Sequence, residues 1–316
     1  MEKVFKTLEE QVDLLRNRGL KIEQSDKKIL EIENYYNVIN GYKDLFLKKK
    51  NPDSYKNDAS FKEIYALFEF DRELRMIFLS KILKIELNIK SLIAYYFSKQ
   101  YGHKDYFLLE NFRTPSKKIS SNKIEEVINV LNETISKSIG KDDTITHYLN
   151  NHGYVPLWVA INAFTLGNIN KFYGILKNSE RSKVSKYYNI QPNEFQNLLK
   201  NIVFFRNKSA HGLRFYNSKY KKFNLKHNIK TPKNTKIYEF FSIPKNDRGK
   251  YIMGRNDLFS LLISLKFFLK YEDFSDLIDS INKEINFLDN KLKTILIKDV
   301  LDSMGFPNNW KELKNI

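Results

Sequence analysis

Three polar side chains at the end of one expected helix could together cleave a phosphodiester. Arg206 and Asn207 lie five and four residues before His211. At about 100° per residue, Asn207 and His211 share one helix face about 40° apart, and Arg206 flanks His211 at about 140°. Arginine can hold a phosphate through two parallel hydrogen bonds, and histidine moves protons well near neutral pH. These roles suit metal-free cleavage of RNA, in which the ribose 2′-hydroxyl is the nucleophile and Asn207 fixes the imidazole or contacts the nucleic acid.

The Arg-x4-His spacing is weak by itself, because ordinary residue frequencies produce it by chance in about one chain of this length in three. Its context strengthens it: the preceding helix has a strongly apolar face, Gly212 follows directly, and a basic segment begins within three residues. The sequence has no HExxH, Walker, GxGxxG or GxSxG pattern. It also has no cysteine. We therefore expect no metal site and no cofactor, and a disulfide scaffold is excluded.

Positive charge is concentrated directly behind this helix. The chain of 316 residues has 54 Lys and Arg against 37 Asp and Glu, a net charge of +17. Residues 214–255 hold 12 basic and two acidic residues, so they carry +10 (12 − 2). Basic side chains follow a phosphate backbone, and the aromatic rings of the same segment can stack on unpaired bases, which favours a nucleic acid as partner. The residues expected to bind RNA are Lys208, Arg214, Lys219, Lys221, Lys222, Arg248, Lys250 and Arg255.

The elements that must position these residues are helices, because apolar residues recur at helical spacing along most of the chain. A long core helix, or two consecutive helices, is expected over residues 60–101, with Ser60 as N-cap and Glu63 as its capping-box partner. Pro192 suits the first position of the helix that carries the motif. A short strand is expected at residues 238–243.

Three further polar residues lie on the long helix. Asp71 and Arg75 are four residues apart, so a structural ion pair is expected. Glu86 follows an apolar face, and it could be partly buried and orient Arg206 or His211. The alternative is that Glu86 has no part in the site.

The sequence shows no pattern of a signal peptide, a membrane-spanning segment or an interdomain linker. The N-terminus lacks the apolar core of a signal peptide, and the apolar stretch 258–269 is too short to span a bilayer and is interrupted by Lys266. We therefore expect a cytoplasmic protein with no membrane partner. No linker rich in Gly, Pro or Ser divides the chain, so residues 1–316 are expected to form a single domain.

At this point the sequence resembles the Abi-like proteins of the AbiD/AbiF type, which carry a HEPN-type nuclease motif. The resemblance covers almost the whole chain and rests on an ordered series of segments, which is far more specific than the Arg-x4-His spacing. These segments are EQVDLLRNRGL, YYNVINGY (35–42), FKEIYALFEFDRELR (61–75), IELNIKSLIAYYFSKQYG (85–102), PLWVAINAFTLGNINKFY (156–173), FFRNKSAHGLRFYN (204–217) and MGFPNNW (304–310).

The resemblance implies an all-α, HEPN-like helical bundle with helical additions at both termini. It divides the chain into N-terminal helices (1–50), a core ending in the motif helix (59–212), the basic-aromatic segment (213–255) and C-terminal helices (256–316). It also implies a role in phage defence, often as a toxin–antitoxin system linked to a small structured non-coding RNA. HEPN ribonucleases form their active groove from two facing motifs, and this chain has one, so the resemblance implies a homodimer with Arg206, Asn207 and His211 as catalytic residues.

Other interpretations remain open. The motif and the basic segment could bind a small RNA without cutting it. A DNA-binding regulator is less favoured, because no recognition-helix pattern stands out and the aromatic residues suit unpaired bases better than a duplex groove. The basic segment could also be a solvated loop anchored by its aromatic residues, and the excess of lysine could reflect AT-rich coding.

Overall fold

The fold is all-α and is organised around one long helix. The computed structural model describes residues 4–116, 119–220 and 232–316, with side chains left out for 232–235. Helix α3 (Phe61–Tyr101) has 41 residues, which corresponds to about 60 Å at 1.5 Å per residue. The Ser60 hydroxyl accepts a bond from the Glu63 backbone, the Glu63 carboxylate caps Ser60 in return, and Gly102 ends the helix at a φ of +81°. The expected long helix is therefore confirmed as a single element.

The remaining elements have the following bounds. Helices that precede the motif are α1 (Leu8–Asn17), α2 (Lys27–Glu33), α4 (Ser121–Ser138), α5 (Asp143–His152), α6 (Leu157–Ala160), α7 (Leu166–Ile175) and α8 (Asn178–Tyr187). The motif helix and those after it are α9 (Pro192–Ala210), α11 (Pro232–Phe240), α12 (Leu258–Lys266), α13 (Tyr271–Asp289) and α14 (Ile297–Met304). Strands β1 (Leu47–Lys49) and β2 (Ser54–Tyr55) form a small antiparallel pair.

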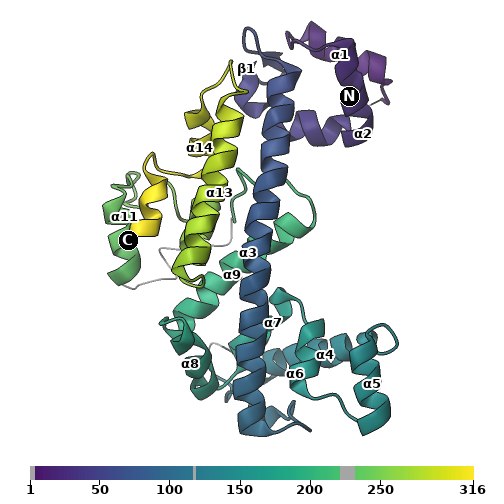
Figure 1. The fold of residues 1–316 in the computed structure, drawn as a ribbon, viewed down its shortest axis with the longest axis vertical. Coiled ribbons are helices and arrows are strands. Elements are labelled where there is room, and N and C mark those ends of the chain that lie inside the picture. Colours follow the sequence, from purple (N-terminus) through teal and green to yellow (C-terminus); the bar gives the residue numbers. More distant parts are fainter. Residues whose placement is uncertain (1–3, 117–118, 221–231) are drawn as a thin grey trace.

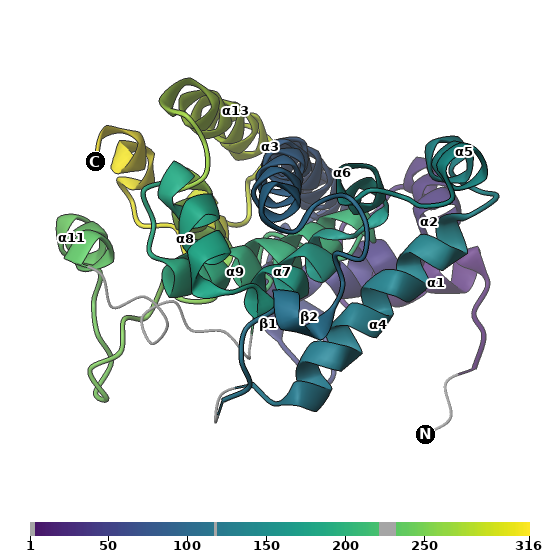
Figure 2. The same cartoon turned by 90° about the horizontal axis from the view of Figure 1, so that it is seen from below.

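The other helices gather at the two ends and along one side of α3. Figure 1 shows α1, α2 and the β1 turn near the start of α3, and α4, α5 and α6 near its end. Helix α13 runs beside α3, and α9 crosses behind it and packs on α3, α7 and α12. Seen from below, α4 and α5 lie on the opposite side of α3 from α11 and the C-terminus (Figure 2).

The core follows the apolar period of α3. Its buried positions recur every three or four residues, which is the spacing of one helix face. Each fully buried aliphatic or aromatic side chain contributes about 1.5–3 kcal/mol to folding. The residues of this face that are fully buried include Leu74, Phe78, Ile82, Ile85, Ile89 and Ile93.

The expected strand at residues 238–243 is wrong, because Tyr238 lies in helix α11. Ile237 and Tyr238 are buried in this helix, and Phe241 is buried directly after its last residue. Their spacing of one, three and four residues places them on one side of a helix, and packing on that side overrides the strand propensity of the aromatic residues.

No helix in the described parts of the chain combines the length and the apolar content needed to cross a bilayer.

Candidate functional site

The motif helix α9 is positioned by its apolar face, which leaves its C-terminal end at the surface. Pro192 occupies the first turn, where its missing N–H is not needed. The helix ends at Ala210, His211 is the C-cap, and Gly212 has a φ of +63°. The His211 N–H still donates to the Asn207 carbonyl at 3.1 Å, so the four-residue helical spacing extends to His211. Asn207 and His211 are therefore both exposed at one helix end.

A buried carboxylate on α3 holds the arginine of the motif. The Arg206 Nε atom lies 3.5 Å from Oε2 of Glu86, and the Arg206 side chain is 24% exposed. Glu86 is buried and also pairs with the buried Lys90 at 3.1 Å. Neither Glu86 Oε2 nor Arg206 Nε makes a hydrogen bond, so charge attraction holds the pair. The interpretation that Glu86 orients Arg206 thus has geometric support.

The rest of the Arg206 guanidinium has no partner among the residues that the structure describes. The structure gives its two terminal nitrogens no hydrogen-bond partner among the described residues. A guanidinium fixed through Nε and open at its terminal nitrogens presents the fork that binds phosphate oxygens in pairs.

His211 borders a cavity between α9, α3 and the chain that follows α2. The cavity has a volume of about 570 Å³. No described residue hydrogen-bonds the His211 imidazole. The polar and aromatic residues that line the cavity with His211 are Glu33, Tyr36, Asn37, Asn40, Tyr42, Phe68, Arg72, Arg75 and Arg214.

A fully buried aspartate fixes the turn directly after His211. The Asp71 carboxylate accepts bonds from the Tyr42 hydroxyl at 2.5 Å and from Arg75 Nη1 at 2.7 Å. It also accepts the backbone N–H groups of Phe215 at 3.0 Å and Tyr216 at 2.6 Å. Burial raises the pKa of Asp71, while these donors oppose the rise. The expected Asp71–Arg75 ion pair is confirmed, and the pair also anchors the exit from the motif.

Sequence patterns did not reveal that Tyr42 belongs to this network. Tyr42 lies 29 residues before Asp71, so no local sequence pattern predicts their contact. Only segment 35–42, one of those that resemble the Abi-like proteins, drew attention to this region. Nearby, Arg214 Nη1 donates to the Gly41 carbonyl at 2.6 Å. The chain after α2 is thereby attached to the turn after α9.

Three of the expected RNA-binding residues lie on or just after the motif helix. Lys208 extends over the Phe204 ring, with Nζ 5.9 Å from its centroid. Arg214 lines the cavity beside His211, and Lys219 is exposed five residues further along. Of the expected RNA-binding residues, Arg214 therefore shares the lining of this cavity with His211.

The other expected RNA-binding residues follow later in the sequence. Arg248 and Lys250 belong to a turn held by the Asn246 side chain, which accepts both of their backbone N–H groups. Arg255 Nη1 donates to the Tyr251 carbonyl at 3.0 Å. Lys221 and Lys222 are outside the described residues.

Helix α11, which precedes the turn, lies near the C-terminus, whereas α9 crosses behind α3 (Figure 1). The end of the segment is nevertheless attached to the motif helix, because the Tyr220 N–H donates to the Asn256 carbonyl at 2.7 Å and the Tyr220 ring stacks on Phe204 of α9.

No group of three or more His, Asp or Glu side chains in the described parts of the chain could hold a metal ion.

The fold and the site define an all-α protein with an Arg-Asn-x3-His helix end beside a cavity. The family model for Abi-like proteins matches residues 28–217, more than half of the chain. The chain therefore belongs to the Abi-like protein family, and membership suggests a role in abortive infection, the defence of bacteria against phage. No curated protein and no solved structure matches the chain.

The match ends directly after the turn that Asp71 anchors. It includes Arg206, Asn207 and His211, together with Arg214. The turn that carries Arg248 lies beyond it. The family relationship thus covers the motif and the residues that position it, but not the second half of the basic segment.

Proposed function

We propose that this protein is a HEPN-type, metal-independent endoribonuclease of bacterial abortive infection. In this proposal it is a toxin that a small structured non-coding RNA controls or accompanies. The observation that carries the proposal is the arrangement at the end of α9. Arg206 is held by buried Glu86, its terminal nitrogens have no partner among the described residues, and exposed His211 borders a cavity.

Each residue of the motif has a role in the proposed reaction. The ribose 2′-oxygen attacks phosphorus, a new bond from this oxygen to phosphorus forms, and the bond to the 5′-oxygen breaks. The products are a 2′,3′-cyclic phosphate and a 5′-hydroxyl. His211 accepts the proton of the 2′-hydroxyl or donates one to the leaving 5′-oxygen, and Arg206 stabilises the charge on the phosphate. Asn207 contacts the imidazole or the RNA.

The proton balance of this reaction favours a homodimer. Cleavage needs one group to accept a proton and another to donate one, and the motif supplies a single histidine per chain. Two copies that place their motifs in one groove would supply both groups. The exposed His211 imidazole, which no described residue hydrogen-bonds, is available for such an arrangement.

The nuclease proposal is tested with purified protein and 5′-labelled RNA in buffer containing EDTA. We expect His211→Ala to lower cleavage by about 10²–10⁴-fold, the usual contribution of a general acid or base. RNA affinity should stay within about twofold of the wild type, because the basic side chains expected to contact the phosphate backbone are unchanged. His147→Ala, at an exposed histidine on α5, is the matched control and should cleave normally. Equal cleavage by His211→Ala and the wild type would refute the catalytic assignment.

A second candidate is a protein that binds RNA in a defence ribonucleoprotein without cutting it. The observation that favours it is that no described residue orients the His211 imidazole. The same experiment separates the two candidates. Labelled RNA that is shifted in a gel but stays uncut, in both the wild type and His211→Ala, would favour binding alone.

A further inference from the structure

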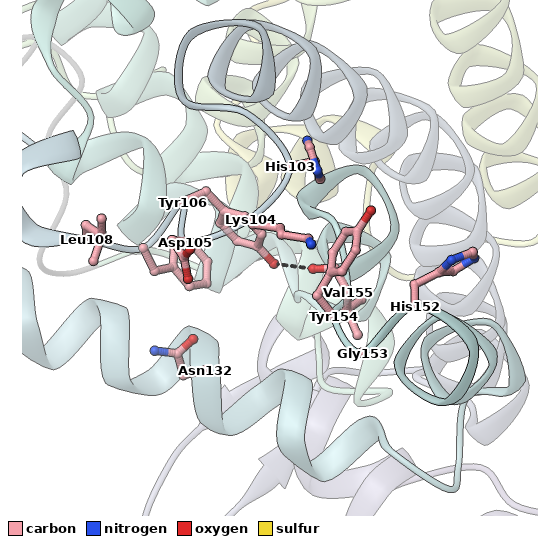
Figure 3. A pocket seen from close by; sticks show the side chains of 11 residues that line it. His103, Lys104, Asp105, Tyr106, Leu108, Asn132, His152, Gly153, Tyr154 and Val155 are labelled. Atoms are coloured by element: carbon pink, nitrogen blue, oxygen red, sulfur yellow. Dashed lines mark hydrogen bonds between the residues drawn. The ribbon is translucent and has the colours of Figure 1, made fainter.

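A second cavity lies at the far end of α3 from the motif. The chain leaves α3 at Gly102 and meets the end of α5, and between them is a cavity of about 530 Å³ (Figure 3). Arg75, which lines the first cavity, and Tyr101, at the end of α3, are 26 residues apart on this helix. At 1.5 Å per residue, the two cavities are about 40 Å apart along the helix axis. The proposed nuclease site therefore leaves the second cavity without a role.

Aromatic rings and one cation gather in this cavity. The Tyr154 ring lies 5.4 Å from the ring of His103 and 6.3 Å from that of His152. The Lys104 ammonium lies 4.5 Å from the centroid of Tyr154. His103, Lys104 and His152 are exposed, and Tyr154 is half-buried. Figure 3 shows Lys104 directed at the Tyr154 ring, with His103 and His152 on either side.

A buried hydrogen bond holds the two walls of the cavity together. The hydroxyl of buried Tyr106 donates to the Val155 carbonyl at 2.8 Å, so the segment after α3 is attached to the segment after α5. Gly153, between the rings of His152 and Tyr154, has a φ of +72°, which favours glycine. Asp105 and Asn132 add hydrogen-bonding groups at the other end of the cavity.

We propose that this cavity binds a nucleotide, either free or as one unit of a single strand. Planar rings stack on a nucleobase, an ammonium pairs with its phosphate, and carboxylate or amide groups read its polar edge. A simple anion would need only Lys104 and would leave the rings without a role.

The energies allow a base to displace Lys104 from the Tyr154 ring. An exposed cation–π contact is worth about 0.5–1 kcal/mol. Stacking of a base on an aromatic side chain is worth about 1–3 kcal/mol. The flexible Lys104 side chain can then turn from the ring to the phosphate, so binding loses little of the charge interaction.

The test uses the full chain, AMP, and a fluorescein-labelled 20-nucleotide oligoadenylate RNA whose 2′-hydroxyls are methylated, so that the proposed nuclease cannot cleave it. Affinities are measured by calorimetry for AMP and by anisotropy for the RNA, over a range of salt concentrations with EDTA present. Tyr154→Leu keeps an apolar side chain but removes the ring, and Lys104→Ala removes the charge. Tyr271→Leu changes a tyrosine that is 61% exposed on α13 and serves as the matched control. Thermal melting of each variant verifies folding.

We expect Tyr154→Leu to weaken binding by at least about fivefold while leaving the salt dependence unchanged, because stacking carries no charge. Lys104→Ala should reduce the slope of log affinity against log salt by about 0.7, the effect of one phosphate contact on a single strand. A loss of AMP binding in Tyr154→Leu identifies a free nucleotide as the occupant, and a loss confined to the RNA identifies a strand.

Affinities for both probes that stay within twofold of the wild type in the two cavity variants would overturn the proposal. A failure of the nuclease proposal would leave it intact, because the measured quantity is binding and His211 lies at the other cavity.

Discussion

At the scale of single residues, the arginine of the motif depends on two buried charges. Glu86 and Lys90 are only 6% and 8% exposed in their side chains, and they lie one helical turn apart on α3. Arg206 reaches this pair from α9. The attraction of Glu86 for Arg206 fixes the direction of a long side chain that otherwise has several rotamers. Helix α9 therefore supplies the positive charge of Arg206, and helix α3 supplies the carboxylate that fixes its direction.

Removing the charge of Glu86 should separate positioning from stability. We expect Glu86→Gln to lower RNA cleavage tenfold or more, because Arg206 loses its fixed direction. It should also destabilise the fold by roughly 3 kcal/mol, because Lys90 is left as an unpaired buried charge. Cleavage of labelled RNA and urea unfolding measure the two effects.

A double variant provides the control. Glu86→Gln combined with Lys90→Met removes both buried charges, so stability should return close to that of the wild type. RNA cleavage should stay low, because Arg206 still lacks the carboxylate that fixes its direction. Recovery of cleavage along with stability would show that Glu86 acts only on folding.

At the scale of elements, helix α12 begins at a buried carboxylate. Asp257 accepts the backbone N–H of Ser260 at 3.0 Å and that of Gly254 at 2.8 Å. Burial nevertheless raises the pKa of Asp257 to about 6, against the effect of these bonds and of Lys219. A side chain on Gly305 would collide with this carboxylate, since a Cβ there would lie 2.4 Å from Asp257 Cγ. The segment 304–310 thus supports the start of α12.

This raised pKa makes stability depend on pH with a defined sign. The folded state holds the proton of Asp257 up to about pH 6, whereas the ordinary pKa is 3.8. The stability from Asp257 is therefore fully present below about pH 4 and lost as the pH rises through 6. Relative to Asp257→Asn, we expect the unfolding free energy of the wild type to fall by up to about 3 kcal/mol from pH 4 to pH 7.

Urea unfolding at pH 4, 5, 6 and 7 measures this difference. Asp276→Asn, at a side chain that is 73% exposed, is the matched control and should follow the wild type. A difference between the wild type and Asp257→Asn that does not change with pH would contradict the assigned pKa.

At the scale of the whole molecule, α3 connects two cavities of different composition. The cavity beside His211 contains the arginines of α3 and residues that follow α2. The other contains histidine and tyrosine rings from the segments after α3 and α5. If both cavities bind the same RNA strand, about 12 stacked nucleotides at 3.4 Å each would span the 40 Å between the cavities.

The proposed homodimer can be tested by mixing chains. If two copies of His211 are needed in one groove, random pairing of equal amounts of wild type and His211→Ala leaves about a quarter of the dimers active. Cleavage per chain should then fall to about a quarter of the wild-type value after co-expression. A value near one half would mean that each chain acts alone, and light scattering of the wild type should agree with the outcome.

The sequence by itself determined the helices and the motif, because these depend on neighbours in the chain. The apolar period and the Ser60–Glu63 capping box predicted α3, and Pro192 and Gly212 bounded the motif helix. The prediction of a strand at 238–243 was wrong, because the packing of Tyr238 in a helix overrode the local preference of aromatic residues for strands.

Only the tertiary structure decided which residues meet across the chain. Tyr42, Asp71 and Phe215 are far apart in sequence but share one buried carboxylate, and no local pattern encodes such a contact. The same holds for Glu86 and Arg206, which are brought together by the packing of α9 on α3. The reason is physical: burial makes an unpaired charge costly, so the folded chain brings partners together wherever its helices cross.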